Sequence, residues 1–178
     1  MSVLIIAEAG VNHNGSLVLA KKLAEKAKEA GADYVKYQTF NPSNMVSKAA
    51  SKADYQKKTT DSSQSQLEML NDLSLSYAEF KELKDYCKSI GIGFLSTSFD
   101  LESTSFLDEL GCDIWKIPSG EITNYPYLVD IAKRHQPIIL STGMCTENDI
   151  TEALEVLNAN GAGKISLLHC TTEYPTPF

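Results

Sequence analysis

The chain has 178 residues, of which 43% are hydrophobic and 22% charged, a composition typical of one soluble globular domain. Acidic residues outnumber basic ones by 23 to 16, so the formal net charge at pH 7 is −7. A surface of this sign repels nucleic-acid phosphates and anionic lipids, which argues against a nucleic-acid or membrane partner.

The N-terminal apolar run ends at Glu8 and contains no basic residue, so it predicts neither a secretion signal nor a membrane span. The four cysteines stand far apart and form no Cys-x-x-Cys pair. A disulfide framework or a zinc knuckle is therefore not expected, and a reducing, cytoplasmic location is.

Six short apolar runs predict β-strands. In chain order they are Val3–Ala7, Tyr34–Tyr37, Gly93–Leu95, Ile114–Ile117, Pro137–Leu140 and Ile165–Leu168. Their residues are continuously apolar rather than alternating in polarity, which is typical of parallel strands that are buried on both faces.

Amphipathic stretches between these runs predict helices. The first has an apolar face made of Leu17, Ala20, Leu23, Ala24 and Ala27. Ser16 is placed to cap the start of this helix, and Gly31 follows its end. Later helices have the same start and stop signals. N-caps are expected at Ser76, Asp100 and Thr146, and glycines that end the helices are expected at Gly91, Gly111 and Gly161. The pattern predicts an α/β architecture of repeated βα units.

Residues 41–75 interrupt this rhythm with a segment rich in Ser, Lys and Gln, in which only a short helix around Leu67–Leu70 is expected. A loop of this length inside a compact domain is usually a functional lid or a disordered insertion. A lid and a solvated linker both remain open.

Two architectures fit six βα units. An open doubly wound sheet often carries a Gly-rich phosphate loop after its first strand, but no G-x-G-x-x-G follows this one. A (β/α)8 TIM-type barrel instead places polar residues at the carboxyl ends of many strands, as this sequence does. Because such a barrel typically needs about 250 residues, we expect either an incomplete barrel in this chain or an open relative of it.

Polar side chains follow all six predicted strands, and a common rim for them describes a ligand site. Lys36 and Lys116 suit a compact anion such as a phosphate or carboxylate, although a strand-end salt bridge is the alternative for each alone. Hydroxyl donors around that anion are expected from Thr97, Ser119 and Ser141. Glu8 and Glu121 are placed to orient hydroxyls or to act as acid and base.

The three histidines have different expected roles. His13, in a loop, could contact a ligand or cap the loop, and His135 is expected to be a surface residue at a helix end. His169 follows the sixth strand and is the histidine expected in the site. No second ligand stands at a recognised metal-binding spacing from it, so no metal site is predicted within the chain. Trp115 is expected to pack between strands and helices, and Cys170 is not expected to be a nucleophile.

These residues lie on segments that resemble the sialic acid synthase (nonulosonate synthase) family. The resemblance extends from Ile5 to the last residue and rests on six motifs in a fixed order. They are Ile6–Gly15, Val35–Phe40, Phe94–Thr97, Trp115–Glu121, Ile139–Met144 and Leu168–Pro177.

The resemblance implies a (β/α)8 barrel that condenses phosphoenolpyruvate with an N-acetylated mannosamine-type sugar, releasing phosphate and forming a nine-carbon 2-keto acid. The positions that it implies for phosphoenolpyruvate binding are Lys36, Thr97, Lys116, Ser119 and Ser141. The sugar-binding positions that it implies are Gln38, Glu121, Thr172 and Tyr174. It places Glu8 beside the reacting groups, so Glu8 and Glu121 are the expected catalytic carboxylates.

The resemblance also implies a divalent metal, usually manganese, that polarises the aldehyde of the sugar. The family's two metal-binding histidines and its small antifreeze-like domain correspond to sequence after Phe178, so residues 1–178 are expected to be the N-terminal part of the barrel. In the family a homodimer brings an arginine of that small domain to the sugar. Where the family usually has proline, this chain has Ser98, which predicts a minor change in loop stiffness.

Two other functions remain open. One is a truncated, non-catalytic barrel that keeps phosphoenolpyruvate-binding groups but lacks the metal site and the cap. The other is a different phosphoenolpyruvate-condensing barrel, such as a deoxy-octulosonate phosphate synthase, which should carry more basic residues for a second phosphate. If the protein is a nonulosonate synthase, its product is also open. Tyr55-Gln56 and Thr172–Tyr174 resemble family members that make legionaminic as well as neuraminic acid, and a pseudaminic product also stays open. An incomplete barrel would expose the edges of its first and sixth strands.

Overall fold

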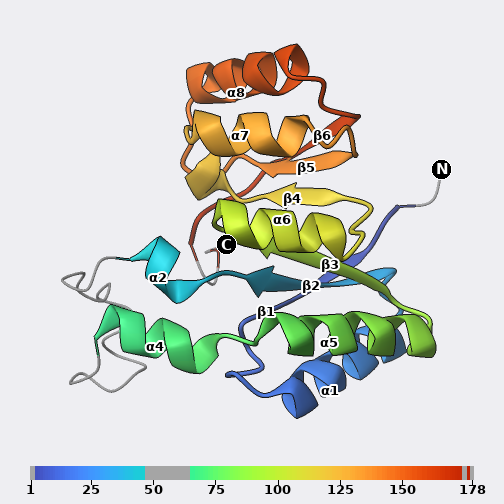
Figure 1. Cartoon of the computed structure of the whole chain (residues 1–178). Coiled ribbons are helices and arrows are strands. Elements are labelled where there is room, and N and C mark those ends of the chain that lie inside the picture. The colour runs from blue at the N-terminus through green and yellow to red at the C-terminus, as the bar shows by residue number, and fades with distance from the viewer. Residues whose placement is uncertain (1–2, 47–64, 174–175, 177–178) are drawn as a thin grey trace. The chain divides into compact units, whose positions relative to one another are not determined.

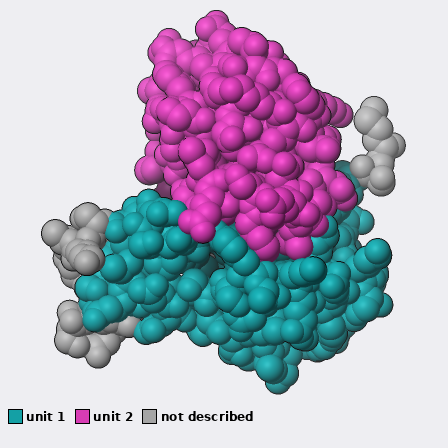
Figure 2. Space-filling model, viewed as in Figure 1, with its two compact units in different colours: residues 1–94 teal, residues 95–178 magenta. Residues whose placement is uncertain are grey.

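The computed structural model describes residues 3–46, 65–173 and 176. Strands and helices alternate along the chain (Figure 1), which confirms the predicted α/β class. The chain divides into two compact units, residues 1–94 and residues 95–178 (Figure 2). Among the described residues, no helix has the length and apolar character needed to cross a membrane.

One three-stranded sheet has the order β1-β2-β3. Its strands are β1 (Ile6–Gly10), β2 (Tyr34–Thr39) and β3 (Gly93–Ser98), and β3 begins in the first unit and continues into the second. The strands β1 and β2 are parallel, and Glu8 lies opposite Lys36 in their register. This register places two of the predicted site residues side by side.

The first strand begins three residues later than the sequence predicts, and Val3, Leu4 and Ile5 are exposed. The backbone of Ile5 is bound to Asp33 instead: its N–H donates to Asp33 Oδ2 at 2.8 Å, and its carbonyl accepts from the Asp33 N–H at 2.9 Å. Ladder pairing with β2 therefore starts at Ile6, opposite Tyr34.

Four helices are described in the first unit. They are α1 (Leu17–Glu29), α2 (Pro42–Met45), α4 (Gln66–Leu73) and α5 (Tyr77–Ile90). The predicted cap at Ser16 is confirmed, because its side chain accepts from the Leu19 N–H. Ser76 and Glu79 form the expected capping box, and α5 ends at Gly91 in the left-handed conformation that glycine adopts most readily.

The interrupting segment contains more helix than predicted. The expected short helix around Leu67–Leu70 is confirmed as part of α4, which is longer. The helix α2, which begins at Pro42, was not predicted. Residues 47–64, with Tyr55-Gln56, lie outside the described residues. The choice between a lid and a linker for that segment stays a prediction.

The second unit contains a parallel sheet of order β4-β5-β6. Its elements are β4 (Trp115–Ile117), β5 (Ile138–Ser141), β6 (Ile165–Leu168), the 3-10 turn η1 (Ser119–Glu121) and the helices α6 (Leu101–Glu109), α7 (Tyr125–Ala132) and α8 (Glu147–Ala159). The predicted caps at Asp100 and Thr146 are confirmed by their bonds to the backbone N–H groups of Ser103 and Asp149. These local signals set where α6 and α8 begin.

The connection from α7 to β5 differs from the others, because a histidine takes the left-handed conformation that glycine takes elsewhere. His135 has φ +58°, and its Nδ1 lies 2.6 Å from the carbonyl oxygen of Gly161. The predicted surface position of His135 is confirmed. Its observed partner is the loop that precedes β6.

The predicted burial of all six strands on both faces is wrong for β6. Leu167 and Leu168 are 48% and 40% exposed, whereas Leu140 on β5 is fully buried. Among the described residues β6 pairs with β5 on one side, and no helix follows it. One-sided pairing explains this exposure, which agrees with the expected open edge. Trp115 is buried as expected, under the guanidinium of Arg134.

Candidate functional site

Three predicted site residues meet at the carboxyl end of β1 and β2. Lys36 Nζ lies 2.6 Å from Glu8 Oε2, and the lysine side chain is 11% exposed while the glutamate side chain is 53% exposed. A Cβ built on Gly10 would lie 3.2 Å from Glu8 Oε1 and 3.6 Å from Gln38 Nε2. Glu8, Lys36 and Gln38 therefore form one polar group, the Glu8 cluster.

The backbone of β1 creates the space for this cluster. The register shifts between Glu8 and Gly10, and Gly10 has φ +53°. Such an irregularity re-aims side chains at the end of a strand. A residue with a side chain at position 10 would be strained and would crowd Glu8.

The charge of Lys36 is balanced by an ion pair with Glu8 in this structure. This is the strand-end salt bridge that the sequence left open as the alternative to anion binding by Lys36. A buried ammonium needs a counter-charge, and Glu8 supplies it from a half-exposed position. An anion that reached Lys36 would compete with a carboxylate that water can solvate, so exchange of one partner for the other is feasible.

His13 lies in the loop after β1 and is fully buried. Its Nδ1 accepts from the Gly15 N–H at 3.2 Å, so Nε2 carries the proton of the neutral ring, and Nε2 has no hydrogen-bond partner among the described residues. Burial lowers the pKa of His13 and outweighs the carboxylate of Glu79, which raises it. Of the two expected roles, the structure shows loop capping.

Thr97 and Lys116 are the most deeply buried of the predicted site residues in the second unit. Thr97 lies on β3 with 2% exposure, and its Oγ1 has no hydrogen-bond partner in the described part of the chain. Lys116, on β4, is 9% exposed, and its Nζ donates to the carbonyl of Ile117 at 3.0 Å. A buried hydroxyl without a partner costs about 1–3 kcal/mol, and such groups in native proteins call for an explanation such as a ligand.

Ser119 and Thr172 converge on the backbone of Gly143. A Cβ at position 143 would overlap the Thr172 hydroxyl oxygen and lie 3.4 Å from Ser119 Oγ. Gly143 is therefore required by close approach. The structure thus brings together one residue assigned to phosphoenolpyruvate and one assigned to the sugar.

The remaining predicted residues occupy separate positions. Glu121 ends η1, and its Oε2 accepts from Asn124 Nδ2 at 2.7 Å. Ser141 is the last residue of β5 and lies opposite Leu168. Tyr174 falls outside the described residues. No interaction that would place Glu121 or Ser141 in one of the groups above is seen among the described residues.

The cysteines and histidines form no metal site in the described part of the chain, where no three His, Cys, Asp or Glu side chains gather to hold an ion. His169 is exposed. The metal site that the resemblance implies stays a prediction for residues outside those described. The four cysteines are free thiols, and burial raises the pKa of Cys87 to about 12.

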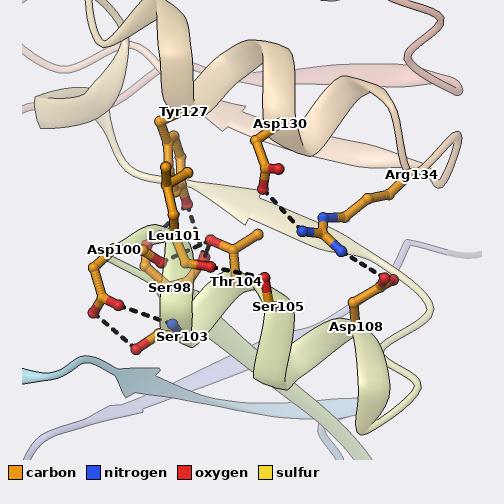
Figure 3. A network of polar contacts seen from close by, with 10 residues as sticks. All are labelled: Ser98, Asp100, Leu101, Ser103, Thr104, Ser105, Asp108, Tyr127, Asp130 and Arg134. Carbon is orange, nitrogen blue, oxygen red and sulfur yellow. Dashed lines mark hydrogen bonds and ion pairs between the residues drawn. The ribbon is translucent and has the colours of Figure 1, made fainter.

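A polar network that the sequence pattern does not predict surrounds Ser98 (Figure 3). Ser98 is 1% exposed, and its Oγ lies 3.1 Å from the Tyr127 hydroxyl. The minor change in loop stiffness expected at Ser98 stays a prediction; the structure places Ser98 at the end of β3 with its side chain buried and hydrogen-bonded. A serine where the resembling family usually has proline was the available signal.

The chain is similar to several known proteins. Over 177 residues the chain is 59% identical to the N,N'-diacetyllegionaminic acid synthase of Campylobacter jejuni, covering 98% of this chain and 53% of that protein. It is 47% identical to the enzyme of the same name from Legionella pneumophila, covering 100% and 51%. The chain thus spans about half the length of the curated relatives it matches.

A solved structure supports the fold. The N-acetylneuraminic acid synthetase of Leptospira borgpetersenii superposes with a TM-score of 0.83 at 29% identity, covering 99% of this chain and 57% of that one. This likeness confirms the predicted barrel-type fold class, with about six βα units in this chain. Residues 23–178 match the NeuB family. The chain belongs to the NeuB family.

Proposed function

We propose that the protein condenses phosphoenolpyruvate with an N-acetylated mannosamine-type sugar to give a nonulosonic acid and phosphate. The observation that carries this proposal is the 59% identity, over nearly the whole chain, to an enzyme named as an N,N'-diacetyllegionaminic acid synthase. A second relative of the same name favours the legionaminic product over the neuraminic or pseudaminic one.

The phosphoenolpyruvate site is proposed at Lys36, Thr97, Lys116, Ser119 and Ser141. Lys36 and Lys116 are buried lysines, one in each unit, in a chain whose net charge is −7, and a lysine ammonium suits a compact anion. The buried hydroxyl of Thr97 would gain the acceptor that it lacks among the described residues.

The sugar site is proposed at Gln38, Glu121, Thr172 and Tyr174. Gln38 lies beside Glu8 around Gly10, and Thr172 lies with Ser119 around Gly143. In each unit, therefore, a residue assigned to the sugar lies beside one assigned to the reacting groups or to phosphoenolpyruvate. Amide, hydroxyl and carboxylate groups of this kind orient the hydroxyls of a sugar.

Glu8 and Glu121 are proposed as the catalytic carboxylates. Glu8 is held at Lys36, and Glu121 is held by the amide of Asn124. Each carboxylate keeps a second oxygen with which to accept a proton or a hydroxyl. A divalent cation, proposed to be Mn²⁺ held by residues outside those described, would supply Lewis acidity toward the sugar's aldehyde. A cytoplasmic homodimer is proposed for the complete protein.

The test is an assay of the complete gene product with phosphoenolpyruvate, manganese and each N-acetylated aminosugar in turn. We expect phosphate release together with a product whose mass is that of the corresponding nonulosonic acid, fastest with the legionaminate precursor. Absence of phosphate release with every sugar would contradict the proposal. If phosphoenolpyruvate still bound, that outcome would favour the non-catalytic alternative.

A further inference from the structure

The end of β3 is held by a buried set of hydroxyl groups, Ser98, Thr104 and Tyr127, which we call the Ser98 clamp (Figure 3). The Tyr127 hydroxyl donates to the backbone carbonyl of Ser98 at 2.8 Å and lies 3.1 Å from Ser98 Oγ. Thr104 Oγ1 donates to Ser98 Oγ at 2.9 Å. All three residues are at most 2% exposed.

A phenol has one proton, and Tyr127 gives it to the carbonyl of Ser98, so the contact between the Tyr127 and Ser98 hydroxyls is donated by Ser98. The Thr104 hydroxyl also has one proton, which is shared between Ser98 Oγ and the carbonyl oxygen of Asp100, each 2.9 Å away. Burial raises the pKa of Tyr127, so the phenol keeps this proton. Tyr127 thus binds both the backbone and the side chain of one residue.

Tyr127 is itself anchored near another proposed site residue. Its N–H donates to Asn124 Oδ1 at 3.4 Å, at the start of α7. The amide of Asn124 also donates to Glu121 Oε2 at 2.7 Å. The clamp is therefore connected through one helix start to Glu121.

The residue before the clamp is Thr97, whose hydroxyl is buried and has no partner among the described residues. Successive side chains of a strand point to opposite faces. Fixing the backbone and side chain of Ser98 therefore also fixes where the Thr97 side chain points. Proline restricts φ at such a position through its ring; serine does not, and here hydrogen bonds to Tyr127 provide the restriction.

We propose that Tyr127, acting through Ser98, is a positioning residue that aims the Thr97 hydroxyl at phosphoenolpyruvate. This inference rests on the proposed function, because that function assigns Thr97 to phosphoenolpyruvate. Tyr127 itself touches no substrate in this scheme. Its effect on affinity should pass through Thr97 alone.

A double-mutant cycle tests the proposal on the complete gene product. The dissociation constant of phosphoenolpyruvate is measured by titration calorimetry for wild type, Tyr127→Phe, Thr97→Val and the double variant, with folding checked by circular dichroism. Tyr127→Phe should weaken binding about fivefold, the equivalent of one typical hydrogen bond. In the Thr97→Val background the same change should have no further effect, because the group that it positions is gone.

Tyr125→Phe is the matched control, since Tyr125 is exposed on the same helix and bonds Glu152 instead; it should leave affinity unchanged. If Tyr127→Phe does not fold, Ser98→Ala replaces it in the cycle, and Ser98→Thr should restore affinity. Unchanged affinity in the clamp variant, or losses that add to those of Thr97→Val, would overturn the inference alone. If wild type does not bind, or Thr97→Val binds normally, the proposed phosphoenolpyruvate site itself fails.

Discussion

The core of this chain contains buried polar side chains, which a core formed only by apolar packing would not contain. His13, Lys36, Thr97 and Lys116 are all buried. Three of them belong to the phosphoenolpyruvate site proposed above. Glu8 balances the charge of Lys36, whereas the Thr97 hydroxyl has no partner among the described residues, and burying an unpaired hydroxyl is unfavourable. At the residue scale, the cost of burying Thr97 points to a ligand more strongly than any single motif does.

Replacing Lys116 tests the anion site directly. Lys116→Ala in the complete gene product should weaken phosphoenolpyruvate binding ten- to hundredfold, roughly the effect of losing one hydrogen bond to a charged group, and should affect sugar binding less. Titration calorimetry with each substrate measures both constants. Lys133→Ala, which removes an exposed lysine of the same unit, serves as control. Equal weakening of both substrates would count against the assignment.

His13 should make stability depend on pH. Burial lowers its pKa in the folded state below the unfolded value of 6.5, so the unfolded chain binds the proton more readily. The neutral ring's contribution is then fully present above pH 6.5 and is lost as the pH falls from 6.5 through the folded pKa. Urea unfolding at a series of pH values from 7.5 to 5 should show this loss.

The variant that tests this prediction is His13→Gln. It removes the buried ring and should flatten the dependence on pH between 7.5 and 5. An identical pH profile for wild type and His13→Gln would show that His13 is not the titrating group.

At the element scale, α8 owes its first turn to a capping box. Thr146 Oγ1 accepts from the Asp149 N–H, and the Asp149 side chain accepts from the Thr146 N–H. These bonds lower the pKa of Asp149. Thr146→Ala should reduce the free energy of unfolding by about 1 kcal/mol, typical of a lost N-cap. Thr151→Ala, in the exposed middle of the same helix, should not destabilise; equal losses would contradict the capping argument.

Helix starts could be predicted because a cap is a local signal. Ser16, Ser76, Asp100 and Thr146 each bond to a residue three positions away. The start of β1 could not, because Val3–Ile5 is as apolar as the strand itself, and the bonds that keep it out of the ladder come from Asp33. The sequence therefore predicts helix caps, whose partners are three residues away, but not hydrogen bonds between residues that are far apart in the chain.

In the whole molecule and its candidate site, too, local features could be predicted from the sequence and contacts between distant residues could not. Strand-end positions could be read from the sequence, and the pairing of Glu8 with Lys36 follows once β1 and β2 are in register. The Ser98 clamp could not be read, because Tyr127 stands 29 residues after Ser98. Hydroxyl partners across such a distance leave no periodic pattern.

The exposed edge of β6 makes a prediction about the behaviour of the 178-residue chain in solution. A strand with unpaired backbone groups and apolar side chains is a template for association with another chain. We expect this chain to self-associate as its concentration rises, and Leu167→Lys to shift it toward monomer, since an edge lysine opposes strand pairing. Sedimentation velocity at several concentrations measures both.

The control for this edge effect is Leu19→Lys, because Leu19 is a comparably exposed leucine, at 41% against 48%, on helix α1. The charge and the loss of apolar area are then the same in the two variants, and they differ in whether the substitution lies on a strand edge. If both variants reduced association equally, general surface hydrophobicity would explain it. A selective effect of Leu167→Lys would identify the open edge of β6 as the cause.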